Sequence, residues 1–396
     1  MEKIGIGFVG AGWMGKALLQ RLRERDDVEI RALLNRDPSR GKAVLRELGL
    51  AEDLLAKDYQ SILDNPAVDT VWLVNPNSYH GPQALAAMRA GKHVFCEKPC
   101  ATRYQDFCEQ IAMEKARPDL ITFVDYILNF DTMQERIHRM VAEGAFGKLT
   151  QIQVNYRHPV NIAGEKQWKL KKDIMGDAIG MGIIHALSVM LKLMSSQTKP
   201  VGVFATSQPA QVRGFEADPI WSILVRFENG ASGFCFGNID SGNGYDAYHS
   251  LYGTQGAFVF DSQQPRPTKV RYWSADSAGG AWVFPLDAEA CERQNVGSLA
   301  WSADTTTPDS GNVIEHQTGA VVAHFIDCVK AGSQSPLSFA NSAAIGEVGW
   351  AALMSAQTGR EIRLPLDRRE TSDFFRMNDQ GFHHERAEGR GNPALA

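Results

Sequence analysis

Three glycines near the start of the chain have the spacing of a phosphate-binding turn. In GFVGAGWMGKALLQRL, Gly10, Gly12 and Gly15 follow an apolar run and precede a helical pattern. The first glycine permits a tight turn, the second lets the backbone approach a pyrophosphate, and the third lets helix and strand pack closely. The same spacing occurs in ordinary turns, so the flanking strand and helix carry the assignment. It predicts a dinucleotide site, which Trp13 and Met14 help to line.

The residues at the end of the second predicted strand bear on the choice of dinucleotide. A carboxylate at this strand tip holds the ribose hydroxyls of NAD. The tip residue here is Asn35, and Arg36 after it is suited to hold a 2′-phosphate or to stack on adenine. Because Asp37 follows directly, NAD and NADP both remain open as cofactors.

A lysine and a histidine are candidates for acid–base chemistry. Lys98 comes directly after a predicted parallel strand, at the end where ligands bind in open α/β sheets. Its ammonium group can donate to a substrate hydroxyl and stabilise an incipient alkoxide. His185 lies in an apolar helical segment, and an imidazole with a pKa near 6.5 suits a base that accepts a hydroxyl proton. Taken alone, the lysine could be a solvated surface residue and the histidine a packed core residue.

A basic segment precedes the helix of His185. It reads Lys166-Gln167-Trp168-Lys169-Leu170-Lys171-Lys172, with Arg157 and His158 a few residues upstream. Such a run is most often a solvated loop. If it instead lies at the mouth of a site, it favours a substrate that bears a carboxylate, phosphate or sulfonate.

The composition excludes several classes of protein. The chain has 396 residues, 44% of them apolar, and a net charge of −5, which argues against a nucleic-acid partner. No apolar run reaches the roughly 20 residues that span a bilayer, and the start MEKIGIGFVG lacks the apolar core of a signal peptide. The six cysteines are dispersed, and the CEKPC segment lacks a second pair for zinc. We therefore expect a cytoplasmic protein with reduced thiols, without a metal and without a membrane partner.

The alternation of strands and helices predicts an α/β Rossmann domain with a doubly wound parallel sheet over residues 1–125. Its strands are expected at residues 4–9, 29–34, 70–74, 93–96 and 120–124, and its helices at 13–23, 38–48, 79–90 and 103–114. A helix at 132–143 leads into a second, α+β domain over residues 126–366, with an open, mostly antiparallel sheet.

The strands of that sheet are expected at 149–156, 202–206, 221–227, 231–236, 250–253, 257–260, 270–273 and 361–364, with helices at 177–193, 315–330 and 341–358. Residues 367–396 are charged and poor in aliphatic side chains, which predicts a tail or a subunit-wrapping arm.

Several longer motifs resemble the glucose–fructose oxidoreductase, inositol dehydrogenase and MocA (Gfo/Idh/MocA) family. They are VNPNSYHGPQALAAMRAGKHVFCEKP, EGAFGKL, YGTQGAFVFD and SAQTGREIRLPL, and the likeness extends to about residue 366. The resemblance implies NAD- or NADP-dependent oxidation or reduction of a hydroxyl-bearing carbon of a sugar or polyol. It implies that Lys98 and His185 are the catalytic pair. It also places Asn75, Pro76, Asn77, His80 and Glu97 beside the nicotinamide.

The substrate side follows from the same resemblance, with one departure. Relatives carry an aspartate one helical turn before the histidine, where this chain has Met181, so the usual proton relay and one substrate contact are missing. A tryptophan and a basic residue at the mouth of the site correspond to Trp168 and to Lys169 or Lys172. Further candidates for substrate contact are Asn129, Tyr156, Arg157, Tyr245 and His316.

Three functions are consistent with these residues. The first is a sugar or sugar-derivative dehydrogenase. The second is a glycosidase of the same scaffold, in which NAD oxidises the sugar transiently so that a C–H bond becomes acidic and a glycosidic substituent is eliminated. Met181 and the basic segment favour this alternative, with an anionic glycoside as substrate. The third is a cofactor-binding regulator without chemistry. An open sheet needs a cover, and relatives often pair sheet to sheet, so a homodimer or homotetramer is expected.

Overall fold

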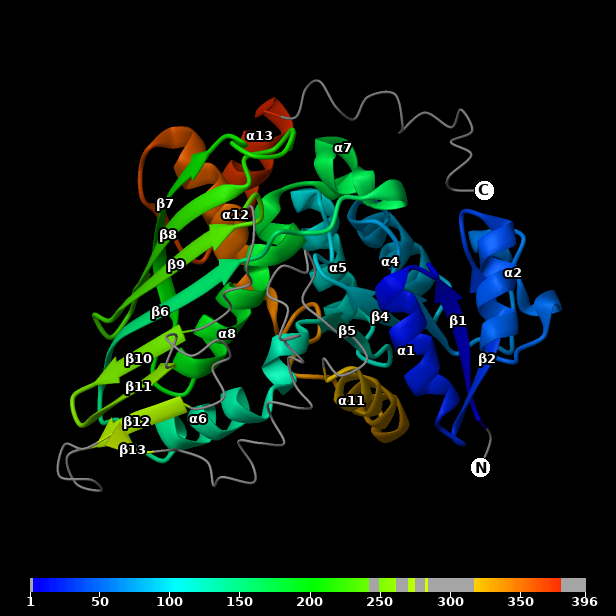
Figure 1. Ribbon diagram of the computed structural model, residues 1–396, viewed down its shortest axis with the longest axis horizontal. Coiled ribbons are helices and arrows are strands. Elements are labelled where there is room, and N and C mark those ends of the chain that lie inside the picture. Colours follow the sequence, from blue (N-terminus) through cyan, green and yellow to red (C-terminus); the bar gives the residue numbers. More distant parts are fainter. Residues whose placement is uncertain (1–2, 242–248, 261–269, 275–281, 284–316, 379–396) are drawn as a thin grey trace.

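Two β-sheets organise the chain (Figure 1); the structure, a computed structural model, describes residues 3–241, 249–260, 270–274, 282–283 and 317–378. The first sheet consists of β1 (Ile4–Val9), β2 (Val28–Leu34), β3 (Thr70–Leu73), β4 (His93–Glu97) and β5 (Thr122–Asp125). All five strands are parallel, in the order β2-β1-β3-β4-β5. The predicted doubly wound sheet is therefore confirmed, with strand bounds that differ from the prediction by at most two residues.

Helices connect these strands, as the alternating pattern predicts. They are α1 (Trp13–Arg23), α2 (Pro38–Glu47), α3 (Tyr59–Leu63), α4 (His80–Arg89) and α5 (Tyr104–Ala116). The sequence analysis missed α3, a helix of five residues that is too short to show a helical period. Asp58 and Ser61 form a capping box at its start, and Tyr59, Ile62 and Leu63 are buried.

The second sheet is larger and mixed. Its strands are β6 (Leu149–Arg157), β7 (Pro200–Gln208), β8 (Ile220–Phe227), β9 (Ser232–Asn238), β10 (His249–Gly253), β11 (Gly256–Phe260), β12 (Val270–Ser274), β13 (Trp282–Val283) and β14 (Ile362–Arg363). They lie in the order β13-β12-β11-β10-β6-β9-β8-β7-β14. Among the described strands of this sheet only β6 and β9 pair in parallel, so the prediction of a mostly antiparallel sheet is confirmed.

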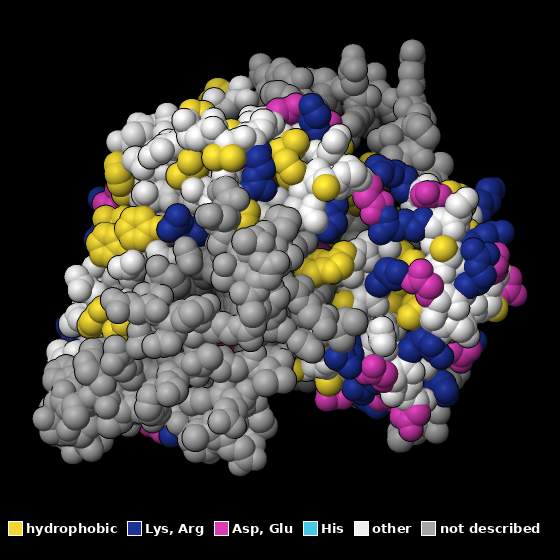
Figure 2. All heavy atoms as spheres, in the orientation of Figure 1, with side chains coloured by type: hydrophobic (Ala, Val, Ile, Leu, Met, Phe, Trp, Pro, Cys, Tyr) yellow, Lys and Arg dark blue, Asp and Glu magenta, His cyan; other side chains and the backbone are white. Residues whose placement is uncertain are grey.

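Helices cover one face of this sheet. α8 (Ile184–Met194) packs on β6, and α12 (Ala343–Thr358) packs on β7; α6 (Thr132–Ala142) lies beside α8 (Figure 1). The opposite face exposes Phe204, Phe234, Phe236 and Tyr252. Hydrophobic side chains are visible at the left of Figure 2, over this sheet. The expected pairing of subunits through the sheet stays a prediction.

The segment that enters α8 departs from regular helix. Residues 177–193 are predicted as one helix, but Ile179–Ile183 forms a π-helical turn before α8 begins. Before it lie a 3₁₀ segment, Gly164–Leu170, and a short helix, α7 (Lys172–Met175). π-turns are rare and occur mostly at functional sites, because they displace side chains from the ordinary helical register.

Two late helices return to the first domain. α11 (Thr318–Ala331) packs on α1, and its Phe325 lies 5.4 Å from Trp72 and 5.6 Å from Phe95 between ring centroids. α13 (Arg368–Asn378) packs on α5, inside the part of the chain predicted as a tail. The core of the Rossmann domain thus includes residues far beyond its predicted end.

None of the helices that the structure describes is long and apolar enough to cross a membrane. No group of three or more His, Cys, Asp or Glu side chains among the described residues is arranged to hold a metal ion.

The contribution of α13 to the free energy of unfolding can be measured by replacing Phe375. Its ring is buried and lies 5.0 Å from the Trp350 ring and 5.8 Å from the Tyr104 ring. Phe375→Ala should lower the free energy of unfolding by about 3 kcal/mol, measured by chemical denaturation, because it removes a buried aromatic side chain. Met377 on the same helix is exposed, so Met377→Ala is the control and should have little effect. Equal effects of the two changes would contradict this packing.

Candidate functional site

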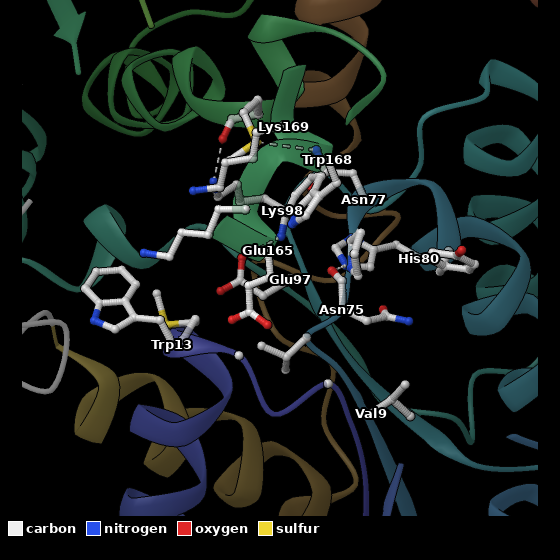
Figure 3. A pocket seen from close by; sticks show the side chains of 18 of the residues that line it. Val9, Trp13, Asn75, Asn77, His80, Glu97, Lys98, Glu165, Trp168 and Lys169 are labelled. Atoms are coloured by element: carbon white, nitrogen blue, oxygen red, sulfur yellow. Dashed lines mark hydrogen bonds between the residues drawn. The ribbon is translucent and has the colours of Figure 1, made fainter. Parts of the chain in front are cut away.

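A cavity of about 340 Å³ lies at the carboxyl ends of the parallel strands and is closed on its other side by residues of the second domain. Most of the predicted site residues line it, and Figure 3 shows many of their side chains. The predicted residues in this lining are Gly10, Gly12, Trp13, Met14, Asn35, Arg36, Asn75, Pro76, Asn77, His80, Glu97, Lys98, Tyr156, Trp168, Lys169, Met181 and His185.

Three predicted substrate residues do not line this cavity. Asn129 is buried elsewhere, where its Nδ2 donates to Ser188 Oγ at 2.9 Å, and it borders a second cavity. Arg157 and Lys172 are exposed at its outside, and the Lys172 N–H donates to the Glu216 carboxylate at 3.0 Å. Proximity to the site residues along the chain therefore did not place these side chains in the cavity. Tyr245 and His316 lie outside the described residues.

The glycine turn, residues 10–15, leaves an open space at the start of α1, which we call the cradle. Gly10 has φ +98°, and a Cβ there would lie 2.5 Å from the Val74 carbonyl oxygen. A Cβ on Gly15 would lie 2.1 Å from the Gly10 oxygen, so this glycine serves close packing and does not line the cavity. A Cβ built on Gly12 would have no described atom within 4 Å apart from those of its chain neighbours. No side-chain hydrogen bond caps the start of α1. The N-terminal N–H groups of α1 therefore face a space that fits a pyrophosphate.

The residue at the tip of β2 is an amide, Asn35, where a ribose-binding carboxylate is usual. The Asn35 amide is engaged on both sides: Oδ1 accepts from the Ala11 N–H at 3.0 Å, and Nδ2 donates to the Asp37 carbonyl at 2.8 Å. The Asp37 carboxylate caps α2 and accepts from the Ser39 N–H at 2.9 Å. Arg36 is exposed and lines the cavity. Asp37 therefore has a structural role at the start of α2, and NAD and NADP both remain open as cofactors.

Two polar side chains predicted for the nicotinamide side brace the loops around it. The ring nitrogens of His80 lie 2.7 Å from the Pro99 oxygen and 2.8 Å from the Asn75 oxygen. Burial lowers the pKa of His80, while the two carbonyl oxygens act in the opposite direction, and the ring joins the loop after β3 to the loop after β4. Asn77 Nδ2 donates to the Met175 carbonyl at 2.8 Å and thereby contacts the second domain.

Lys98 also reaches the second domain. Its Nζ donates to the main-chain oxygen of Met181 at 2.6 Å, as the dashed line in Figure 3 indicates. Met181 lies in the π-turn, one helical turn before His185, whose side chain is buried and lines the same cavity. The ring of Tyr156 lies 5.8 Å from that of His185, and its hydroxyl lies 3.1 Å from His158 Nδ1. The two predicted catalytic residues therefore meet at one cavity across the domain boundary.

A buried pair of carboxyl groups lies behind Lys98. Glu97 and Asp125 are neighbours in register at the ends of β4 and β5, and both are buried. Burial raises the pKa of Glu97, and burial together with the neighbouring Glu97 raises the pKa of Asp125 further. Both carboxyl groups are therefore harder to ionise than exposed ones. The sequence analysis missed Asp125, although its place at the end of an apolar strand beside Glu97 was a usable signal.

The basic segment folds over the glycine turn. We call residues 164–170 the strap. Lys166 Nζ lies 5.5 Å from the centroid of the Trp13 ring, and Glu165 forms an ion pair with Arg40. Neither Glu165 nor Arg40 was predicted, because no local pattern links the two positions.

The four lysines of the basic segment have different surroundings. Lys166 and Lys169 line the cavity. Lys171 pairs with Glu216 at 2.6 Å, and Lys172 is exposed, both outside the cavity lining. Lys166 and Lys169 therefore belong to the site, whereas Lys171 and Lys172 are surface residues outside the cavity lining.

The cradle at Gly12 gives a direct test of dinucleotide binding. Gly12→Val should abolish binding, because the new side chain fills the space that a pyrophosphate needs. The chain should stay folded, because no atom lies within 4 Å of the new Cβ. Titration calorimetry with NAD and with NADP, beside circular dichroism, measures both expectations. Full affinity in a folded Gly12→Val protein would contradict the site.

Comparisons with known proteins agree with this geometry. Residues 4–126 match the model of an oxidoreductase family with an NAD-binding Rossmann fold, and residues 135–259 match the Gfo/Idh/MocA C-terminal domain. The levoglucosan dehydrogenase of Pseudarthrobacter phenanthrenivorans is 25% identical over 92% of this chain and 99% of its own length. The 2,7-anhydro-N-acetylneuraminate hydratase of Escherichia coli is 24% identical over 66% of this chain and 68% of its own.

Solved structures show the same fold. A levoglucosan dehydrogenase in complex with NADH and levoglucosan superposes with a TM-score of 0.74 at 22% identity, over 92% of this chain and 100% of that one. An aldose–aldose oxidoreductase from Caulobacter crescentus gives 0.71 at 23% identity, over 92% and 100%. With both domains matched by family models and the cradle, Lys98 and His185 at one cavity, this chain belongs to the Gfo/Idh/MocA family of NAD-binding oxidoreductases.

Proposed function

We propose that this chain transfers a hydride between NAD(P) and a hydroxyl-bearing carbon of a sugar or sugar derivative. The observation that carries the proposal is a single cavity lined by the glycine cradle, by Lys98 from the first domain and by His185 from the second. The sugar dehydrogenases named above are similar over most of the chain, which supports a carbohydrate substrate.

In this proposal, Lys98 and His185 act on the same substrate oxygen. The bound nicotinamide ring supplies the acceptor for the hydride. Lys98 donates a hydrogen bond to the oxygen and stabilises its developing negative charge, while His185 accepts the hydroxyl proton. The contact from Lys98 Nζ to Met181 O holds the ammonium group one helical turn from His185. Tyr156, Trp168 and Lys169 border the remaining space and would contact the sugar.

A second candidate is a reaction without net redox change, in which transient oxidation allows elimination of a substituent from an anionic sugar. Two observations favour it. Met181 replaces the carboxylate expected one turn before His185, and Lys166 and Lys169 bring positive charge to the cavity. The similarity to an anhydro-sugar hydratase fits the same chemistry.

Product analysis distinguishes the two candidates. The protein is incubated with neutral and anionic sugars and their glycosides, and reduced nicotinamide is followed by absorbance while products are identified by mass spectrometry. A dehydrogenase should form one reduced nicotinamide per oxidised sugar. Cleaved or hydrated product without net change of the cofactor would establish the second candidate and contradict the first.

The roles of Lys98 and His185 are tested by removing each side chain. Lys98→Met and His185→Ala should each lower turnover by roughly 10²–10⁴-fold and leave dinucleotide affinity nearly unchanged. The double variant should lose less than the product of the two effects, because residues that act as one unit are not additive. Lys199→Met is the control, because Lys199 is an exposed lysine outside this cavity. Single-turnover rates in His185→Ala that match the parent would show that His185 only packs in the core.

A further inference from the structure

The strap lies in the second domain by sequence, but two of its side chains contact the dinucleotide-binding half of the cavity. We propose that the strap is part of the dinucleotide site and that Glu165 selects NAD over NADP. This inference rests on the dinucleotide cradle alone and does not depend on the reaction proposed above. In Figure 3, Glu165 lies near the centre of the view and Trp13 at its left, at the start of the helix of the first domain.

The position of Glu165 is set by its ion pair with Arg40. Arg40 lies in the first turn of α2, directly after the tip of β2, and both residues line the cavity. In Rossmann domains the tip of this strand faces the ribose of the adenosine half, where a carboxylate accepts hydrogen bonds from the ribose hydroxyls. The ion pair therefore brings a carboxylate from the second domain to the strand tip, where Asn35 takes the usual place of the carboxylate.

Two carboxylates lie at this end of the cavity, those of Asp37 and Glu165. Among the described residues, the carboxylates in the lining are Asp37, Glu97 and Glu165. Asp37 caps α2 through Oδ1, and Glu97 lies at the end of β4, with β1 and β3 between it and β2 in the sheet. Asp37 Oδ2 can still accept a hydrogen bond, so Glu165 adds a second acceptor for the ribose hydroxyls.

The same carboxylate disfavours a 2′-phosphate. A phosphate on the ribose would place its negative charge against the Glu165 carboxylate and would compete with it for Arg40. Arg36 is exposed at the strand tip and offers the phosphate a cation, but the opposing charge of Glu165 stays at the site. Electrostatics therefore favour the hydroxyl of NAD over the phosphate of NADP.

Lys166 fixes the strap on the cradle. Its ammonium group sits over the ring of Trp13, the first residue of α1, at the helix end that faces the pyrophosphate. This cation adds to the positive end of the helix dipole beside a doubly negative pyrophosphate. The strap thus presents a carboxylate to the ribose and an ammonium group to the pyrophosphate, which matches the charges of NAD at both points.

The test is the pair of dissociation constants for NAD and NADP, measured by titration calorimetry on the full chain. The parent should bind NAD more tightly. Glu165→Gln should shift the ratio of the two affinities toward NADP by about tenfold, the effect of one hydrogen bond to a charged group. Lys166→Met should weaken both dinucleotides and leave their ratio unchanged. Glu216→Gln is the matched control, because it removes the ion pair of Lys171 just beyond the strap, outside the cavity lining.

Three results would overturn the proposal: tighter binding of NADP by the parent, an unchanged ratio in Glu165→Gln, or the same shift in Glu216→Gln. Unchanged affinities in Lys166→Met would remove the strap from the dinucleotide site. Circular dichroism verifies that each variant is folded. Since only binding is measured, failure of the proposed sugar chemistry leaves this test intact.

Discussion

The hydrogen bond from the Lys98 ammonium group to the main-chain oxygen of Met181 joins the two halves of the site. Lys98 belongs to the end of a parallel strand, and Met181 to the turn that leads into the helix of His185. A partly buried ammonium group needs hydrogen-bond acceptors, because it has lost much of its water. A backbone carbonyl meets that need at a fixed position. The spacing between the strand end and α8 is therefore coupled to the position of the charge that faces the substrate.

Met181 contributes its backbone where related chains are expected to use a carboxylate side chain. The π-turn places the Met181 carbonyl toward Lys98, while its sulfur lies 3.8 Å from Asn77 Nδ2. A neutral carbonyl holds the lysine without adding a negative charge to the cavity. Glu97 and Asp125 are buried at the ends of β4 and β5, and burial raises the pKa of both. The cavity therefore carries less negative charge than a carboxylate at position 181 would give it.

The local features of this molecule could be predicted from its sequence, whereas few of its long-range contacts could. The glycine turn was predictable because the spacing of its glycines has a direct physical meaning, whereas Lys98 and His185 followed from the family resemblance together with their chemistry. Arg157 and Lys172 were candidates in or beside the basic segment, and Asn129 was a further candidate. None of these three lines the cavity. The contact between Glu165 and Arg40 was not predictable, because the two residues are far apart in sequence and neither position follows a local rule. The π-turn was also missed, because an apolar segment such as 177–193 has the same pattern in either kind of helix.

The return of α11 to the first domain has a consequence for synthesis of the chain. Phe325 covers Trp72, Phe95 and Phe123, the aromatic face of the parallel sheet. Phe325 is made about 200 residues after Phe123, and a ribosome working at about 5–20 residues per second needs about 10–40 s for that length. During this interval the nascent N-terminal domain exposes aromatic rings that only a much later helix covers. The growing chain thus has a defined period in which a holdase chaperone can protect it from aggregation.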